Sequence, residues 1–143
     1  EVAALGGRAA LDDYGNLIAT FEPVACEVVE PVLLSCHGDT VKPGCGIEPV
    51  LEDGTIRSKG DTILGADDKA GIAEVLEALR VAPIRPPIEL AISRQEEVGL
   101  LGVKAMDFDR IRARRGFLMD NDTLDITCKP GIGSSSGFSV CRF

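Results

Sequence analysis

The stretch from Gly60 to Gly71 constrains this chain most, because it places two adjacent carboxylates where a glycine-flanked loop turns into a helix. Apolar residues recur at helical spacing from there until Pro83, so Asp67 and Asp68 lie in or just before the first helical turn. Aspartate at this place is also typical of a helix N-cap, where it satisfies backbone N–H groups and suits the helix dipole. Other parts of the sequence are needed to decide whether Asp67 and Asp68 form a helix cap or a chemical site.

Ligating or acidic side chains also follow three predicted strands. The strands and the residues after them are Val28–Cys36 before His37 and Asp39, Ile88–Arg94 before Glu96 and Glu97, and Gly116–Met119 before Asp120. Residues two apart in an extended chain share a face, so His37 and Asp39 can point the same way. Taken singly, a histidine or an acidic loop is more often structural. Because open α/β sheets place ligands at the carboxyl ends of their strands, we expect these side chains to gather at one edge.

The remaining pattern predicts further strands and one more helix. Ala9–Thr20 has two short apolar pieces around a turn signature, and Gly44–Ser58 is typical of a hairpin with an acidic tip. A helix is expected over Lys104–Arg115. Thr127–Phe143 includes the small-residue run Pro130–Gly137, which is typical of a flexible tail outside the sheet.

This order of elements predicts an α/β fold. We expect a three-layer sandwich in which a mixed, mainly parallel sheet lies between helices. With 143 residues and 45% hydrophobic content, the chain has room for one domain with an ordinary packed core.

Composition excludes several classes of partner. The net charge is −8 and only 4% of the residues are aromatic, which argues against a nucleic-acid partner. The chain lacks an apolar run of about 18 residues and a signal-peptide pattern, so no membrane partner is expected. The five cysteines are odd in number and never follow C-x-x-C spacing. This fits a cytoplasmic protein without a thiolate zinc site, and Cys36 is expected to pack in the core.

The chemical set comprises one imidazole and three carboxylates, from His37, Asp67, Glu97 and Asp120. Nitrogen and oxygen donors without thiolate suit Zn²⁺, Mn²⁺ or Co²⁺. A carboxylate can bridge two such ions about 3.5–4 Å apart. A metal ion of this kind lowers the pKa of the water bound to it towards ~7. Of two adjacent glutamates, one can bind metal while the other transfers a proton. Serine-hydrolase and P-loop motifs are absent.

Four motifs in order carry a family resemblance. They are His37–Val41, Leu64–Ala73, Gln95–Leu100 and Gly116–Asp120. Their sequence and approximate spacing resemble the M20 family of dinuclear zinc peptidases, most closely its tripeptide aminopeptidase (peptidase T-like) branch. The resemblance covers roughly Ala4 to Asp125, and four ordered motifs are far more specific than one.

The resemblance implies a role for each matched residue. The metal ligands would be His37 and Asp120 at one zinc, Glu97 at the other and Asp67 as the bridge between them. Glu96 would be the general base, and Asp39 would orient His37 and assist catalysis. Asp68 has no ligand role in the family pattern, which leaves it a helix cap. Two zinc ions are expected in a complete site, with Co²⁺ or Mn²⁺ as alternatives.

The chain also departs from the family. Family members have an inserted lid domain, used for homodimerisation and substrate contacts, and a C-terminal histidine at the second zinc, whereas His37 is the only histidine here. We therefore expect a truncated, zinc-exopeptidase-like catalytic domain over residues 1–126, followed by a tail over 127–143. One zinc site would be complete and the other would lack a ligand.

The expected activity is zinc-dependent hydrolysis of the N-terminal peptide bond of short peptides. An N-acyl-amino-acid deacylase or a carboxypeptidase of the same family would share every motif. A non-catalytic, metal-binding remnant is the alternative outside the enzymes, because the second histidine is missing.

Overall fold

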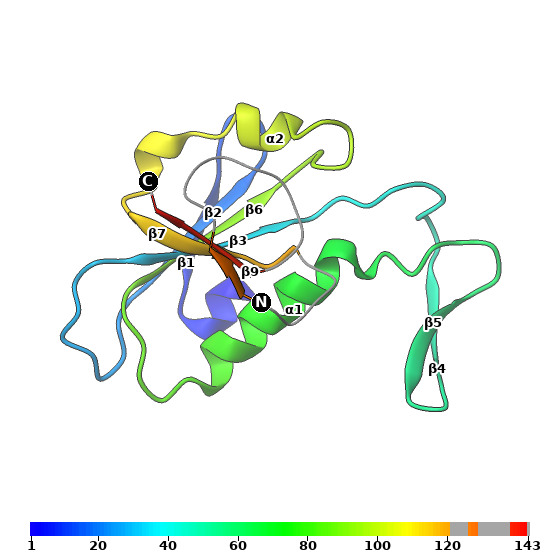
Figure 1. The fold of residues 1–143 in the computed structure, drawn as a ribbon, viewed down its shortest axis with the longest axis horizontal. Coiled ribbons are helices and arrows are strands. Elements are labelled where there is room, and N and C mark those ends of the chain that lie inside the picture. The colour runs from blue at the N-terminus through cyan, green and yellow to red at the C-terminus, as the bar shows by residue number, and fades with distance from the viewer. Residues whose placement is uncertain (121–125, 129–137, 143) are drawn as a thin grey trace.

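A computed structural model of the chain describes residues 1–120, 126–128 and 138–142. Within these residues, a seven-stranded sheet has the order β1-β2-β6-β3-β7-β9-β8, and β4 pairs with β5 in a separate hairpin (Figure 1). The strands are β1 (Arg8–Leu11), β2 (Leu17–Phe21), β3 (Val32–His37), β4 (Glu48–Glu52), β5 (Thr55–Lys59), β6 (Ile88–Ser93), β7 (Arg115–Leu118), β8 (Ile126–Cys128) and β9 (Phe138–Arg142).

The parallel strands that matter for the site lie in the middle of the sheet. β3 runs parallel to both β6 and β7, with Leu34 opposite Leu90 on one side and Phe117 on the other. β1, β2 and β9 join by antiparallel pairing. The sheet is therefore mixed, and the carboxyl ends of β3, β6 and β7 meet at one edge, as the sequence predicted.

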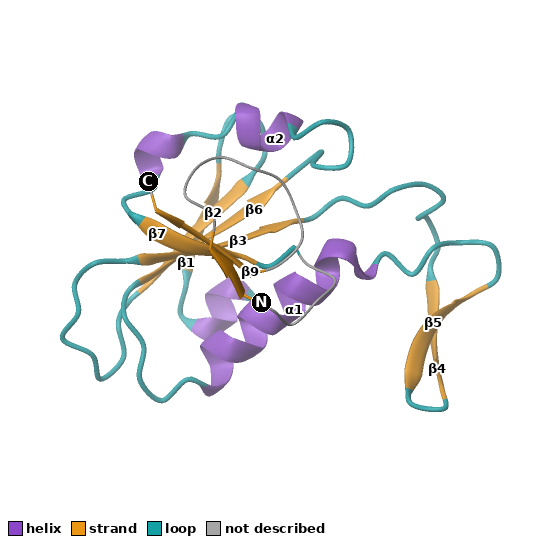
Figure 2. Ribbon diagram, in the orientation of Figure 1, coloured by secondary structure: helices purple, strands orange, loops and turns teal. Residues whose placement is uncertain are grey.

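Helices and loops cover both faces of this sheet (Figure 2). On one face, α1 (Ala66–Val81) packs Val75 and Leu79 into a core with β2, β3 and β6, and a 3₁₀ turn at Val2–Leu5 lies beside it. The opposite face is covered by the segment with the short helix α2 (Leu101–Lys104) and the 3₁₀ turn η2 (Phe108–Arg110), where Met106 is buried against the sheet. The α/β class with helices on both faces is confirmed.

The expectation of a helix over Lys104–Arg115 is wrong. α2 ends at Lys104 after one turn, η2 follows at Phe108–Arg110, and the chain is extended at Ile111 ahead of β7. The reason is Glu89 on β6, whose buried carboxylate accepts the backbone N–H groups of Arg112 (2.8 Å) and Ala113 (2.9 Å). Helical backbone would instead use these N–H groups internally.

The expectation that the tail lies outside the sheet is also wrong where the structure describes it. β9 pairs with β7 in antiparallel register, Gly116 opposite Cys141, and β8 pairs parallel to β9. The small-residue run Pro130–Gly137 lies outside the described residues. The division into residues 1–126 and 127–143 stays a prediction.

The hairpin predicted within Gly44–Ser58 is confirmed as β4 and β5, which extend to one side of the main sheet (Figure 1). Leu51 and Ile56 form a cross-strand pair on it and are largely exposed. Among the described helices, none has the length and apolar character needed to cross a membrane.

Candidate metal centre

His37 occupies the centre of the site because it ends the middle strand of the sheet. Its side chain is almost completely buried, and its Nε2 lies 3.0 Å from Asp67 Oδ1 at the start of α1. On the other side of the ring, Nδ1 lies 3.1 Å from the backbone oxygen of Asp39 and 3.5 Å from its carboxylate. The imidazole is thus oriented between two aspartates, which is how proteins commonly position a ligating histidine.

Asp68 does not cap the helix. Gly65 occupies the N-cap position, no side-chain cap hydrogen bond forms, and Asp67 and Asp68 have non-helical backbone angles around a cis peptide bond. The buried carboxylate of Asp68 instead accepts the backbone N–H of His37 at 3.1 Å. The start of α1 is therefore joined to the end of β3, and Asp67 projects towards His37 with much of its side chain exposed.

Asp39 acts on the loop that follows β6. Its two carboxylate oxygens accept the backbone N–H groups of Glu96 (2.9 Å) and Glu97 (3.2 Å). Burial acts to raise the pKa of Asp39, but these hydrogen bonds outweigh it and lower the pKa. Glu96 Oε2 comes within 4.0 Å of His37 Nε2. Sequence reasoning placed Asp39 beside His37 but did not foresee that it holds both glutamates.

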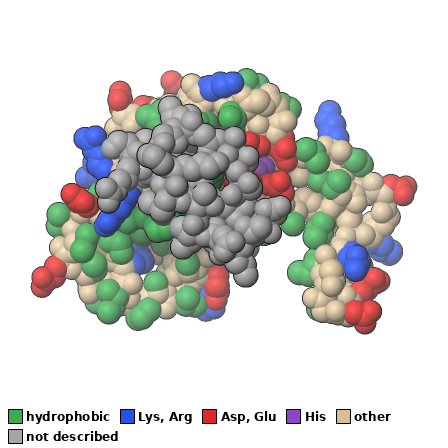
Figure 3. Space-filling view, in the orientation of Figure 1, with side chains coloured by type: hydrophobic (Ala, Val, Ile, Leu, Met, Phe, Trp, Pro, Cys, Tyr) green, Lys and Arg blue, Asp and Glu red, His purple; other side chains and the backbone are tan. Residues whose placement is uncertain are grey.

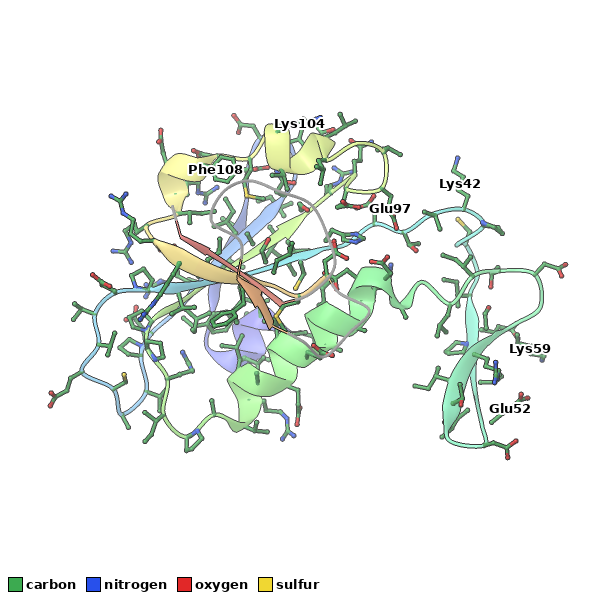
Figure 4. The ribbon with its side chains drawn as sticks, in the orientation of Figure 1. Lys42, Glu52, Lys59, Glu97, Lys104 and Phe108 are labelled. Atoms are coloured by element: carbon green, nitrogen blue, oxygen red, sulfur yellow. The ribbon has the colours of Figure 1, made fainter. Side chains whose placement is uncertain are left out.

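Three of the proposed ligands converge. Ligand atoms of His37, Asp67 and Glu97 all lie within 4.8 Å of one another. Figure 3 shows the histidine among acidic side chains, and Figure 4 shows Glu97 near the end of β3. Asp120, at the end of β7, is half-buried and does not belong to this group of three in the described part of the chain.

The charges around His37 favour its protonated form. Burial acts to lower the pKa of His37, but the hydrogen bond to Asp67 and the charges of Asp120, Asp68 and Asp67 outweigh it, so the pKa is raised. One imidazolium cannot neutralise this number of carboxylates.

Two carboxylates show the resulting excess of negative charge. Burial raises the pKa of Glu96, and the charges of Asp120 and other carboxylates add to it against the opposing effect of His37. Burial also raises the pKa of Asp120, and the charge of Asp67 adds to it. Among ion pairs between described side chains, none joins a Lys or Arg to these groups. Converging nitrogen and oxygen donors with uncompensated negative charge fit a divalent cation.

A mainly apolar pocket of about 610 Å³ lies apart from this site. It is lined by Leu33, Phe108, Ile111, Arg112, Ala113 and Arg114. None of these residues contributes to the group around His37, and Figure 4 shows Phe108 well away from Glu97.

The family comparison identifies the type of protein. The model of peptidase family M28 matches residues 16–121, which include every residue of the candidate centre. It names M28, so the M20 branch indicated by the motifs stays a prediction. The coarser expectation, a peptidase family of the type to which M20 and M28 both belong, is confirmed.

One curated protein and two solved structures are similar to most of this chain. The chain is 42% identical to protein YqjE of Bacillus subtilis (strain 168) over 112 residues, covering 76% of this chain and 30% of YqjE. The crystal structure of aminopeptidase PepT from Bacillus cereus superposes with a TM-score of 0.80 at 42% identity, covering 86% of this chain and 36% of PepT. A tripeptidase from Staphylococcus aureus gives a TM-score of 0.80 at 34% identity, covering 88% and 37%. The chain thus spans about a third of the length of these relatives.

Proposed function

Because this chain belongs to peptidase family M28, we propose that it provides the metal centre of a zinc-dependent aminopeptidase that cleaves the N-terminal peptide bond of short peptides. The observation that carries the proposal is the convergence of donor atoms from His37, Asp67 and Glu97 within 4.8 Å. Structural neighbours named aminopeptidase and tripeptidase support this substrate class, in keeping with the peptidase T-like motifs.

The proposed ligands come from four separate elements. His37 and Asp120 would hold one zinc, Glu97 the second, and Asp67 would bridge them. The short His37–Asp67 distance of 3.0 Å and the position of Glu97 support this assignment. Co²⁺ and Mn²⁺ accept the same donors, so the proposal concerns a divalent ion of this class with Zn²⁺ as the first choice.

Glu96 is the proposed general base. Bound zinc would polarise the scissile carbonyl and make water more acidic. Glu96 lies on the same rim, 4.0 Å from His37, and its pKa is raised, which brings it closer to the range in which a carboxylate exchanges protons near neutral pH. Asp39 supports this role by holding the backbone of Glu96 and Glu97. It is therefore a positioning residue for both glutamates as well as a neighbour of His37.

The proposal also covers the partner and the compartment. The expected partner is a short peptide substrate. This chain covers about a third of the length of its relatives, which leaves room for the lid domain of the family resemblance, and a homodimer would form through that domain. The described cysteines Cys26, Cys36 and Cys45 are unpaired, which supports a reducing compartment such as the cytoplasm.

Zinc content tests the metal centre directly. The purified chain is expected to retain zinc after dialysis, and Asp67→Ala is expected to lose it, because Asp67 contacts His37 and would bridge both ions. Asp61→Ala, which removes an exposed carboxylate from the same loop, is the matched control and should keep the metal. A folded wild-type chain that binds no zinc would refute the proposed centre.

Substrate choice is tested separately. The zinc-loaded protein is offered a tripeptide and an N-acetylated amino acid, and release of the N-terminal residue from the tripeptide alone is expected. Hydrolysis of the N-acetylated amino acid alone would contradict the aminopeptidase assignment and indicate a deacylase.

A further inference from the structure

The buried side chain of Asn16 bonds to three different segments. Asn16 lies at the end of the turn between β1 and β2, and it is fully buried. Its Oδ1 accepts the backbone N–H of Arg94 at 3.0 Å. Its Nδ2 donates to the backbone oxygen of Gly102 at 2.9 Å and to Asp12 Oδ2 at 2.7 Å. Both the oxygen and the nitrogen of this amide therefore form hydrogen bonds. A buried amide that is satisfied on both sides is held in one orientation.

Arg94 and Gly102 flank the loop Gln95–Leu101, which carries Glu96 and Glu97. A single amide therefore joins the residue before this loop to the residue after it. The two ends approach closely: a Cβ on Gly102 would lie 2.0 Å from the backbone oxygen of Arg94 and 2.6 Å from Asn16 Oδ1. Only glycine permits this approach.

The turn that presents Asn16 is itself ordered by Asp12. Asp12 Oδ1 accepts the backbone N–H groups of Tyr14 (3.0 Å) and Asn16 (2.8 Å). The hydroxyl of Tyr14 then donates to the side-chain oxygen of Gln95, the first residue of the glutamate loop. The Asp-Tyr-Gly-Asn signature, which the sequence indicates only as a turn, thus contacts the loop at its beginning and end.

We propose that Asn16 is a positioning residue for the metal centre: it closes the base of the Gln95–Leu101 loop so that Asp39 can hold Glu96 and Glu97 beside His37. The roles given to the two glutamates rest on the proposed function, whereas the contacts that hold the loop do not. Asp39 contacts the second and third residues of the loop through their backbone N–H groups. Asn16 contacts Arg94 just before the loop and Gly102 just after it, so the loop is held both at its base and at the two glutamates.

Amide hydrogen exchange tests the positioning without relying on activity. The backbone N–H groups of Glu96 and Glu97 both donate to Asp39, so their exchange rates report whether the loop is held in place. In Asn16→Ala, exchange at these two amides is expected to rise about tenfold beyond any change shared by the whole sheet, the factor expected for one lost hydrogen bond.

Glu89→Gln is the control for a general loss of stability. Glu89 is as buried as Asn16 and holds backbone N–H groups, but those belong to Arg112 and Ala113 rather than to the glutamate loop. Tyr14→Phe is a second test variant, because it removes only a hydroxyl at an exposed contact and does not endanger folding. It should raise exchange at Glu96 and Glu97 in the same direction and by a smaller factor.

Zinc titration of the same variants separates the two proposals. Both proposals are supported if Asn16→Ala shows faster exchange at Glu96 and Glu97 together with about tenfold weaker zinc binding, and Glu89→Gln shows neither change. Faster exchange with unchanged zinc affinity supports the positioning role and contradicts the ligand role of Glu97. If Asn16→Ala and Tyr14→Phe leave exchange at the two amides no faster than Glu89→Gln does, Asn16 is not a positioning residue.

Discussion

Replacing Asp68 by asparagine should stabilise the metal-free chain at neutral pH. Asp68 is only 3% exposed, and its carboxylate accepts the backbone N–H of His37. Burial raises the pKa of Asp68 to about 6 from an ordinary 3.8, with the charges of Asp120 and Asp67 adding to the effect and the contacts to His37 opposing it. Asparagine has the same shape and can still accept this hydrogen bond, but carries no charge.

The size and sign of the effect follow from proton linkage. Below pH 3.8, Asp68 is protonated in both the native and the unfolded state, so it contributes no difference. Between pH 3.8 and about 6, only the native state keeps the proton, so the free energy of unfolding falls as the pH rises. Above pH 6 the loss is complete and amounts to about 3 kcal/mol. Asp68→Asn should therefore gain nothing near pH 4 and up to ~3 kcal/mol above pH 7.

Urea unfolding from pH 4 to pH 8, with a chelator present, measures this difference. Asp61→Asn, at an exposed position of the same loop, is the control and should follow the wild-type curve. Added zinc should reduce the difference between wild type and Asp68→Asn, because a nearby cation stabilises the ionised carboxylate. Parallel curves for wild type and Asp68→Asn over the whole pH range would refute the reasoning.

Two further substitutions test how the site is held. Asp39→Ala removes the acceptor for two backbone N–H groups and should lower the free energy of unfolding by about 2 kcal/mol, since the carboxylate is partly exposed; an unchanged urea midpoint would contradict this. Gly71→Ala places a Cβ 2.2 Å from Asp68 Oδ1 and 2.5 Å from the backbone oxygen of Met119, so ~1–3 kcal/mol should be lost on thermal unfolding. The hairpin-turn variant Gly54→Asn meets no atoms at its Cβ but adopts a left-handed backbone (φ +77), which asparagine tolerates better than other side chains, so it should lose less, at most about 1 kcal/mol.

Secondary-structure elements were predicted correctly from the sequence where the local pattern and the tertiary environment favour the same conformation. Apolar spacing from Ile72 to Leu79 predicted α1, and the glycine at the acidic tip predicted the β4–β5 hairpin. The Lys104–Arg115 helix failed because a distant carboxylate, that of Glu89, takes the backbone N–H groups that a helix would need. β9 was missed because it joins the sheet by pairing with β7, a contact that its small-residue surroundings do not indicate.

The sequence by itself determined which side chains lie at one edge of the sheet. His37, Glu96, Glu97 and Asp120 lie at or after the ends of strands, and parallel strands bring their carboxyl ends to one edge whatever the details of packing. Which of them converge with Asp67 was decided by the tertiary structure. Tertiary structure alone decided how these groups are held. Asp39 binds the backbone of Glu96, Asp68 binds the end of β3, and Asn16 binds Arg94 just before the Gln95–Leu101 loop. These hydrogen bonds join residues 31 to 78 positions apart, and no local periodicity encodes a contact between segments that only the folded sheet brings together.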